Sequence, residues 1–159
     1  MGLDACVYCD CFETGRLNER PPFIETIFVC PDGALDCRSE DLHTQLAFDR
    51  WLRDRACAHE NGVLIHRRIG NMALVSLLRR ELSRAAANFP MILEKIVYNG
   101  IHAGDFLSLD DVRSLQSELD DLRDFVCSGE REREFLDDFR RQLAELTAAS
   151  LRFGKPISF

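Results

Sequence analysis

Cysteine and histidine supply most of the side chains in this chain that could do chemistry. Three cysteines stand close together near the N-terminus, as Cys6-x-x-Cys9-x-Cys11. On a strand, Cys9 and Cys11 would share one face and Cys6 the other, so the three are poorly placed to bind one ion. If a hairpin lay beside that strand, Cys30 or Cys37 could complete a thiolate site for zinc, which takes about four tetrahedral ligands. The sequence has no second Cys-x-x-Cys, and the alternative is that these are buried free thiols.

A second group combines a thiol, an imidazole and a carboxylate, in Cys57-x-His59-Glu60 with His66 further along. These are the ingredients of a nucleophilic site, although catalytic partners usually come from separate segments of a chain. The two histidines are seven residues apart, not the four that would place both on one face of a helix. The competing interpretation is a polar surface turn.

A third group lies in the segment from Tyr98 to Asp105, where Gly100 and Gly104 flank His102. Glycines allow backbone conformations used around ligands, and polar loop residues on a rigid scaffold often form sites. His102 with Asp105 could act as an oriented base or as a contact pair for a partner. The structural alternative is that Gly100 ends a helix and Asp105 caps the next turn.

Hydrophobic periodicity and helix caps predict the elements that must position these groups. Asn71 and Ser108 are suited to begin helices, and Asp111 would complete a capping box with Ser108. Leu77 and Leu119 are expected to be buried on the apolar faces of those two helices. Strands are predicted at 5–12, 23–30, 34–37, 63–68 and 157–159, and helices at 39–56, from 71, from 90 to 100, from 108 and at 130–153.

This order of elements predicts an α+β fold, with strands mostly early and helices mostly late. We expect a small, mainly antiparallel sheet, made of the N-terminal strands plus a hairpin, packed against four to five helices. The 159 residues fit a single α+β domain spanning 1–159.

The amino-acid composition of the chain argues against some classes of binding partner. The chain is 46% apolar and 30% charged, with a net charge of −7 and a pI near 5.1. An acidic chain is not expected to bind nucleic acid through phosphate contacts. No apolar run approaches a membrane span, and no export signal opens the sequence, so we expect a cytoplasmic protein with reduced thiols and no membrane partner.

Two short motifs carry a resemblance to known proteins. The chain opens Met1-Gly2-Leu3-Asp4 before a tyrosine-containing strand, and it contains the Tyr98-to-Asp105 segment. Together these resemble a loose group of short bacterial cytosolic proteins, some of which stand beside toxin genes as immunity partners. The resemblance implies a bacterial cytosolic protein and supplies neither a reaction nor a catalytic residue.

The leading functional expectation is a non-enzymatic interaction protein, most plausibly an acidic immunity-type inhibitor of a toxin with a basic surface.

The alternative is a small metal-binding protein or hydrolase. Its catalytic residues would be His59, His66, His102 and Asp105, and zinc would be the cofactor, held by Cys9, Cys11, Cys30 and Cys37. The expected contact residues for a protein partner are Tyr98, His102, Asp105, Asp110, Asp111, Glu118 and Asp121, although acidic runs are often only the solvated face of a helix.

Overall fold

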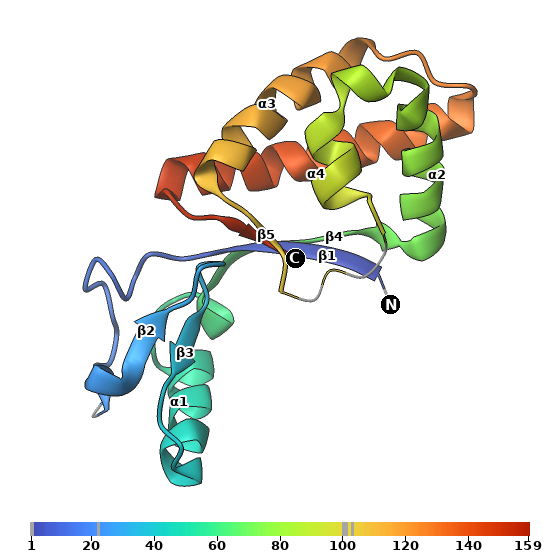
Figure 1. Cartoon of the computed structure of the whole chain (residues 1–159). Helices are drawn as coiled ribbons and strands as arrows, with labels where there is room; N and C mark the ends of the chain where they lie inside the picture. Colours follow the sequence, from blue (N-terminus) through green and yellow to red (C-terminus); the bar gives the residue numbers. More distant parts are fainter. Residues whose placement is uncertain (1, 22, 100–101, 103) are drawn as a thin grey trace.

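The computed structural model describes residues 2–21, 23–99, 102 and 104–159. Figure 1 shows helices on one side of a small sheet and a smaller lobe extending from the other side. The sheets are antiparallel and the chain is largely helical, so the predicted α+β class is confirmed. Among the described residues, no helix has the length and apolar character needed to cross a bilayer.

The larger sheet is built around the N-terminal strand. Its order is β4-β1-β6-β5. Alternate residues of β1, namely Leu3, Ala5 and Val7, are buried against the helices, as the two-residue period of a strand requires. The predicted C-terminal strand is present and pairs with β1. The strands are β1 (Gly2–Tyr8), β4 (Val63–Asn71), β5 (Phe106–Leu107) and β6 (Ile157–Ser158).

Helices α2, α3 and α4 cover the buried face of this sheet and form the main core with it (Figure 1). The side chain of Asn71 accepts the backbone N–H of Leu74 at 3.0 Å and so caps α2, as predicted. Ser108 and Asp111 form the predicted capping box of α3. These helices are α2 (Met72–Leu82), α3 (Leu109–Asp124) and α4 (Glu130–Phe153).

The segment between α2 and α3 is less regular than predicted. A 3-10 segment, η3 (Ser83–Asn88), is followed by a single π-helical turn, η4 (Ile92–Ile96), instead of a helix running from Pro90. The predicted helix end at Gly100 lies outside the described residues. Leu119 of α3 is buried as predicted, whereas Leu77 of α2 is only half-buried, because Val75 and Leu78 face the core instead.

The smaller lobe is an insertion between β1 and β4. It has its own hydrophobic core of Ile27, Phe48, Trp51 and Ala56. Its helix is capped by Asp41, which accepts the backbone N–H of Thr44 at 2.9 Å, two residues after the predicted start of this helix at residue 39. The elements of the lobe are η1 (Ile24–Thr26), β2 (Ile27–Val29), β3 (Leu35–Cys37), α1 (Leu42–Asp54) and η2 (Glu60–Gly62).

The hairpin β2–β3 does not extend the sheet that contains β1, contrary to the sequence prediction. It forms a separate two-stranded sheet. It cannot lie beside β1, because both edges of β1 are already paired, with β4 on one side and β6 on the other. The first strand also ends at Tyr8 instead of Phe12, so the cysteines that follow lie in a turn.

Two polar contacts hold the lobe against the rest of the chain. The hydroxyl of Ser158 in β6 donates to the Asp32 carboxylate in the hairpin turn at 2.9 Å. Lys155, which is buried, forms an ion pair with Glu13. Gly33 has a φ of +92°, and a Cβ there would lie 3.3 Å from Pro156, so this turn of the hairpin needs glycine.

Candidate metal site

The candidate site lies where the chain enters and leaves the lobe. The entering segment follows β1 and carries Cys9 and Cys11, and the leaving segment follows α1 and carries Cys57 and His59. The backbone N–H of Cys9 donates to the carbonyl of Gly62 at 2.8 Å, which fixes the two segments side by side. We call these segments, residues 9–18 and 56–62, the neck.

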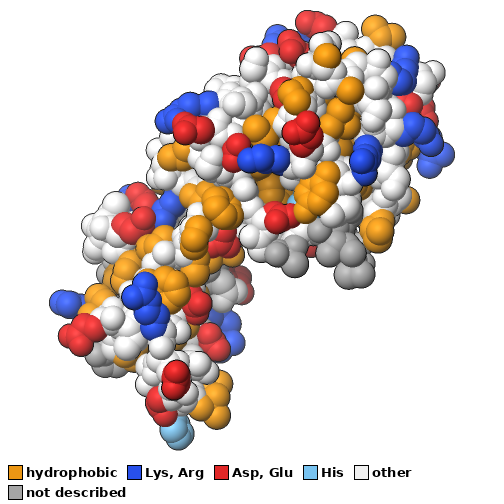
Figure 2. All heavy atoms as spheres, in the orientation of Figure 1, with side chains coloured by type: hydrophobic (Ala, Val, Ile, Leu, Met, Phe, Trp, Pro, Cys, Tyr) orange, Lys and Arg blue, Asp and Glu red, His pale blue; other side chains and the backbone are white. Residues whose placement is uncertain are grey.

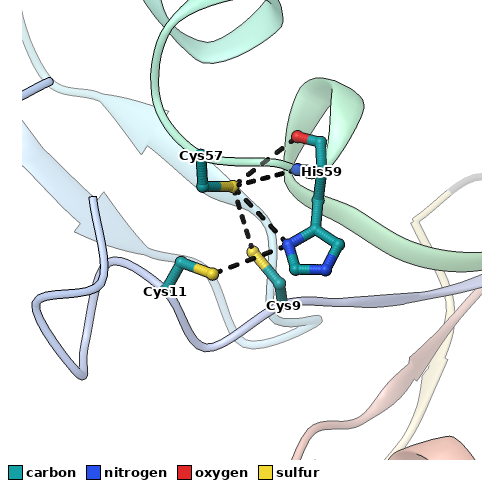
Figure 3. Close-up of side chains that lie close together, drawn as sticks. All are labelled: Cys9, Cys11, Cys57 and His59. Carbon is teal, nitrogen blue, oxygen red and sulfur yellow. Dashed lines mark hydrogen bonds between the residues drawn. The ribbon is translucent and has the colours of Figure 1, made fainter. Parts of the chain in front are cut away.

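The end of α1 and the turn after it direct the side chains of Cys57 and His59 toward those of Cys9 and Cys11. Helix α1 ends when Arg55 and Ala56 donate to the carbonyl of Trp51, and the chain then bends through residues 56–59. A tight turn follows, in which Gly62 donates to the carbonyl of His59 at 3.0 Å and itself has a φ of +69°. Figure 3 shows the thiols of Cys9 and Cys11 pointing at the side chains of Cys57 and His59.

The distances between the ligand atoms of this cluster are short. The ligand atoms of Cys9, Cys11, Cys57 and His59 all lie within 4.8 Å of one another. Cys9 Sγ is 3.8 Å from Cys57 Sγ. The Nδ1 atom of His59 is 3.6 Å from Cys11 Sγ and 3.7 Å from Cys57 Sγ.

These separations match a tetrahedral zinc site. With Zn–S of about 2.3 Å and Zn–N of about 2.0–2.1 Å, tetrahedral angles put two sulfurs about 3.8 Å apart, and a sulfur and a nitrogen about 3.5 Å apart. The Cys9–Cys57 distance equals the first value, and the two sulfur–nitrogen distances are within 0.2 Å of the second. Three thiols and one imidazole are also a known structural zinc ligand set.

Burial raises the pKa of two of the thiols. The pKa of Cys9 rises to about 12, chiefly by desolvation, although a backbone hydrogen bond from Cys11 opposes the rise. Burial likewise raises the pKa of Cys11. A reactive cysteine needs a lowered pKa, so the environment of these two thiols does not favour a nucleophilic role. A divalent cation would reverse this effect, because a coordinated thiol loses its proton.

The backbone also contributes to the site. The N–H of His59 points to the sulfur of Cys57, with a nitrogen–sulfur distance of 3.4 Å. Hydrogen bonds of this kind orient a thiolate ligand and spread its charge, as second-shell contacts do in metal sites generally.

Sequence reasoning found two of the four residues as metal ligands. Cys30 and Cys37 do not join Cys9 and Cys11, and the sulfur of Cys37 instead lies 3.3 Å from the hydroxyl of Thr26. Cys57 and His59 had been grouped as a nucleophilic pair. The signal that could have identified them as ligands is the repetition of a short spacing, Cys-x-Cys followed by Cys-x-His.

His66 is separate from this site. It is exposed on β4, opposite Cys6 of β1 in the sheet register. Within the described part of the chain, no contact links His66 to His59 or to the Tyr98-to-Asp105 segment. The four residues proposed as a hydrolase site therefore do not meet.

Tyr98, His102 and Asp105 do come together. The Tyr98 hydroxyl donates to the Asp105 carboxylate, which raises the pKa of Tyr98. The His102 side chain is only 2% exposed, with Nδ1 3.3 Å from the same carboxylate, and its ring packs between Tyr98 and Phe159. Tyr98 and Asp105 border a surface pocket, but His102 is not on its lining. The described contacts of His102 are those of a packed residue.

Only some of the acidic residues predicted to contact a protein partner are exposed. Glu118 is buried and accepts the backbone N–H groups of Met91 and Ile92, at 2.7 and 2.9 Å, so its assignment as a contact residue is wrong. Asp111 is bound to Ser108 and Lys95. Asp110 and Asp121 are exposed. Acidic and basic side chains are interspersed on the face in Figure 2, and a basic toxin as partner stays a prediction.

Comparison of the chain with protein-family models, with curated proteins and with solved structures gives no match.

Proposed function

We propose that this chain is a zinc-binding protein, with Cys9, Cys11, Cys57 and His59 as the four ligands of a structural site. The single observation that supports this proposal best is the convergence of three sulfurs and one nitrogen within 4.8 Å of one another, with three of the pairs at tetrahedral zinc distances. The four side chains come from two segments 48 residues apart, which random placement of free thiols would rarely bring together.

The type of ligand argues for zinc over harder cations. Calcium and magnesium take oxygen ligands, whereas thiolates and imidazole suit zinc. Four protein ligands complete a tetrahedron and leave no position for a substrate, which is typical of structural zinc and not of catalytic zinc.

The proposed role of the metal is to close the neck of the lobe. The lobe core contains few fully buried side chains, Ile27, Phe48, Trp51 and Ala56, and so small a core gives little stability by itself. A metal that joins the two ends of the insertion removes conformational freedom from the unfolded lobe, and its binding energy becomes folding energy.

The proposal is tested by metal analysis of the full chain purified without an affinity tag. We expect about one equivalent of zinc per chain, retained through dialysis, because structural zinc sites bind tightly. Replacing zinc with cobalt(II) should give the intense visible absorption of a tetrahedral thiolate complex. Less than about a tenth of an equivalent after reconstitution under reducing conditions would contradict the proposal.

Two cysteine variants make the test specific. Cys57→Ser should lose zinc and the cobalt spectrum. Cys30→Ser should keep both, because Cys30 lies in the hairpin outside the cluster. Equal loss in both variants would point to adventitious binding by thiols.

A further inference from the structure

The candidate zinc site contains a pair of sulfurs placed for oxidation. Cys57 is half-buried and gives an oxidant access to the pair that it forms with Cys9, whereas Cys9 and Cys11 are more enclosed. The sulfurs of Cys9 and Cys57 are 3.8 Å apart, and a disulfide bond is about 2.05 Å long. The two atoms must therefore approach by about 1.8 Å to form the bond.

We propose that a peroxide oxidant converts Cys9 and Cys57 into a disulfide and releases the zinc, so that the site responds to redox conditions. This inference rests on the proposed zinc site and adds a regulation to it. The observations that support it are the separation of the two sulfurs and the access to the pair through the half-buried Cys57.

The chemistry is a two-electron oxidation. One zinc-bound thiolate attacks the peroxide, the O–O bond breaks, and a sulfenic acid and one hydroxide form. The second thiolate then attacks the sulfenic sulfur, the S–S bond forms and the S–O bond breaks with loss of a second hydroxide. The two sulfurs lose two electrons in total, and hydrogen peroxide accepts them.

Zinc leaves because the site no longer has enough ligands. A disulfide is not a thiolate and does not hold zinc, so only Cys11 and His59 remain. Two ligands fall short of the four that structural zinc requires.

The disulfide would join the same two segments that the metal joins. Cys9 lies on the entering segment of the neck and Cys57 on the leaving segment. The lobe would therefore stay closed at its base in both states, and oxidation would free the metal without unfolding the lobe. In this respect the site would differ from a zinc site whose oxidation also unfolds the segment that the metal holds.

The test uses the full chain loaded with zinc under reducing conditions, with its zinc content measured before any oxidant is added. Hydrogen peroxide is then titrated while a chromogenic chelator reports free zinc. We expect about one equivalent of zinc per equivalent of peroxide consumed, and a peptide map containing a Cys9–Cys57 disulfide. Excess reductant with zinc should restore the starting state. Cys30→Ser should behave as the unchanged chain does.

The outcomes separate the two proposals. A reduced chain that holds no zinc overturns both the zinc site and its regulation. A chain that holds zinc but retains it in peroxide, or releases it without a Cys9–Cys57 disulfide, overturns the regulation alone. A disulfide between Cys9 and Cys11 also overturns it, because that bond would not join the two sides of the neck.

Discussion

The indole N–H of Trp51 in α1 donates a hydrogen bond of 2.7 Å to the backbone carbonyl of Glu19, the residue that follows the entering segment of the neck. Trp51 is the single tryptophan of the chain and is buried in the lobe core. Its fluorescence therefore reports on the lobe and not on the helices that cover the main sheet.

Removal of zinc should change the environment of Trp51. If the metal closes the neck, a strong chelator should shift the Trp51 emission to longer wavelength, because water reaches the ring as the lobe loosens. The helical circular dichroism of α2, α3 and α4 should change little, since their core is separate. Unchanged emission after the loss of bound zinc would show that the metal does not hold the lobe together.

Glu118 should matter for stability and not for partner binding. Its carboxylate satisfies two backbone N–H groups at the start of η4, so Glu118→Ala should lower the free energy of unfolding by about 2–4 kcal/mol by orphaning them. Asp121→Ala is the matched control, because Asp121 is exposed on the same helix, and it should cost less than about 0.5 kcal/mol. Chemical denaturation measures both, and equal effects would contradict the structural role of Glu118.

The stabilisation that Glu81 provides should depend on pH. The hydroxyl and backbone N–H of Ser128 donate to its carboxylate at 2.7 and 3.0 Å, and these bonds, with Arg84, lower the pKa of Glu81. A lowered folded-state pKa means that the stabilisation is complete above the unfolded pKa and is lost as pH falls through the folded one.

Glu81→Gln should therefore destabilise the fold at pH 7 by about 1–3 kcal/mol, and the difference from the unchanged chain should shrink towards about pH 3. Denaturation curves at several pH values measure this difference. A difference that stayed constant with pH would show that charge on Glu81 is not what holds Ser128.

His102→Ala should destabilise the fold, because the ring is buried between Tyr98 and Phe159. We expect a loss of about 1–3 kcal/mol in the free energy of unfolding, from lost packing of an aromatic ring. Asp105→Asn keeps the side-chain volume and an acceptor for the Tyr98 hydroxyl, so it should lower the free energy of unfolding by less than His102→Ala does. A His102→Ala chain as stable as the original would show that packing of the His102 ring does not stabilise the fold, and would favour the site role expected from the sequence.

Leucine truncation should distinguish the two helices. Leu119→Ala should lower the free energy of unfolding by about 2–5 kcal/mol, since Leu119 is buried. Leu77→Ala should lower it by about half as much, because Leu77 is only half-buried. Thermal or chemical denaturation of the two variants side by side measures the ratio. A larger loss for Leu77→Ala would mean that α2 is rotated relative to the packing described above.

Local features of the fold were predictable from the sequence because their causes are local. Asn71 and Ser108 cap helices with side chains that reach a backbone N–H three residues away, and no distant contact is needed. The capping of the turn at Ile92–Ile96 was not predictable, because its first N–H groups are bound by Glu118, which is far along the chain. The same distant contact explains why Glu118 was wrongly assigned to the surface.

The sequence by itself determined the α+β class, most helix starts, and the residue types from which a zinc site could be made. Only the tertiary structure decided which cysteines meet. Pairing of β1 with β4 and β6 leaves no edge of β1 for the hairpin, and Cys30 and Cys37 stay apart from Cys9 and Cys11. The end of α1 and the start of β4 instead carry Cys57 and His59 to the neck. The spacing of cysteines and histidines along a chain limits which of them can bind the same ion. The path of the backbone between them then decides which of these residues come together.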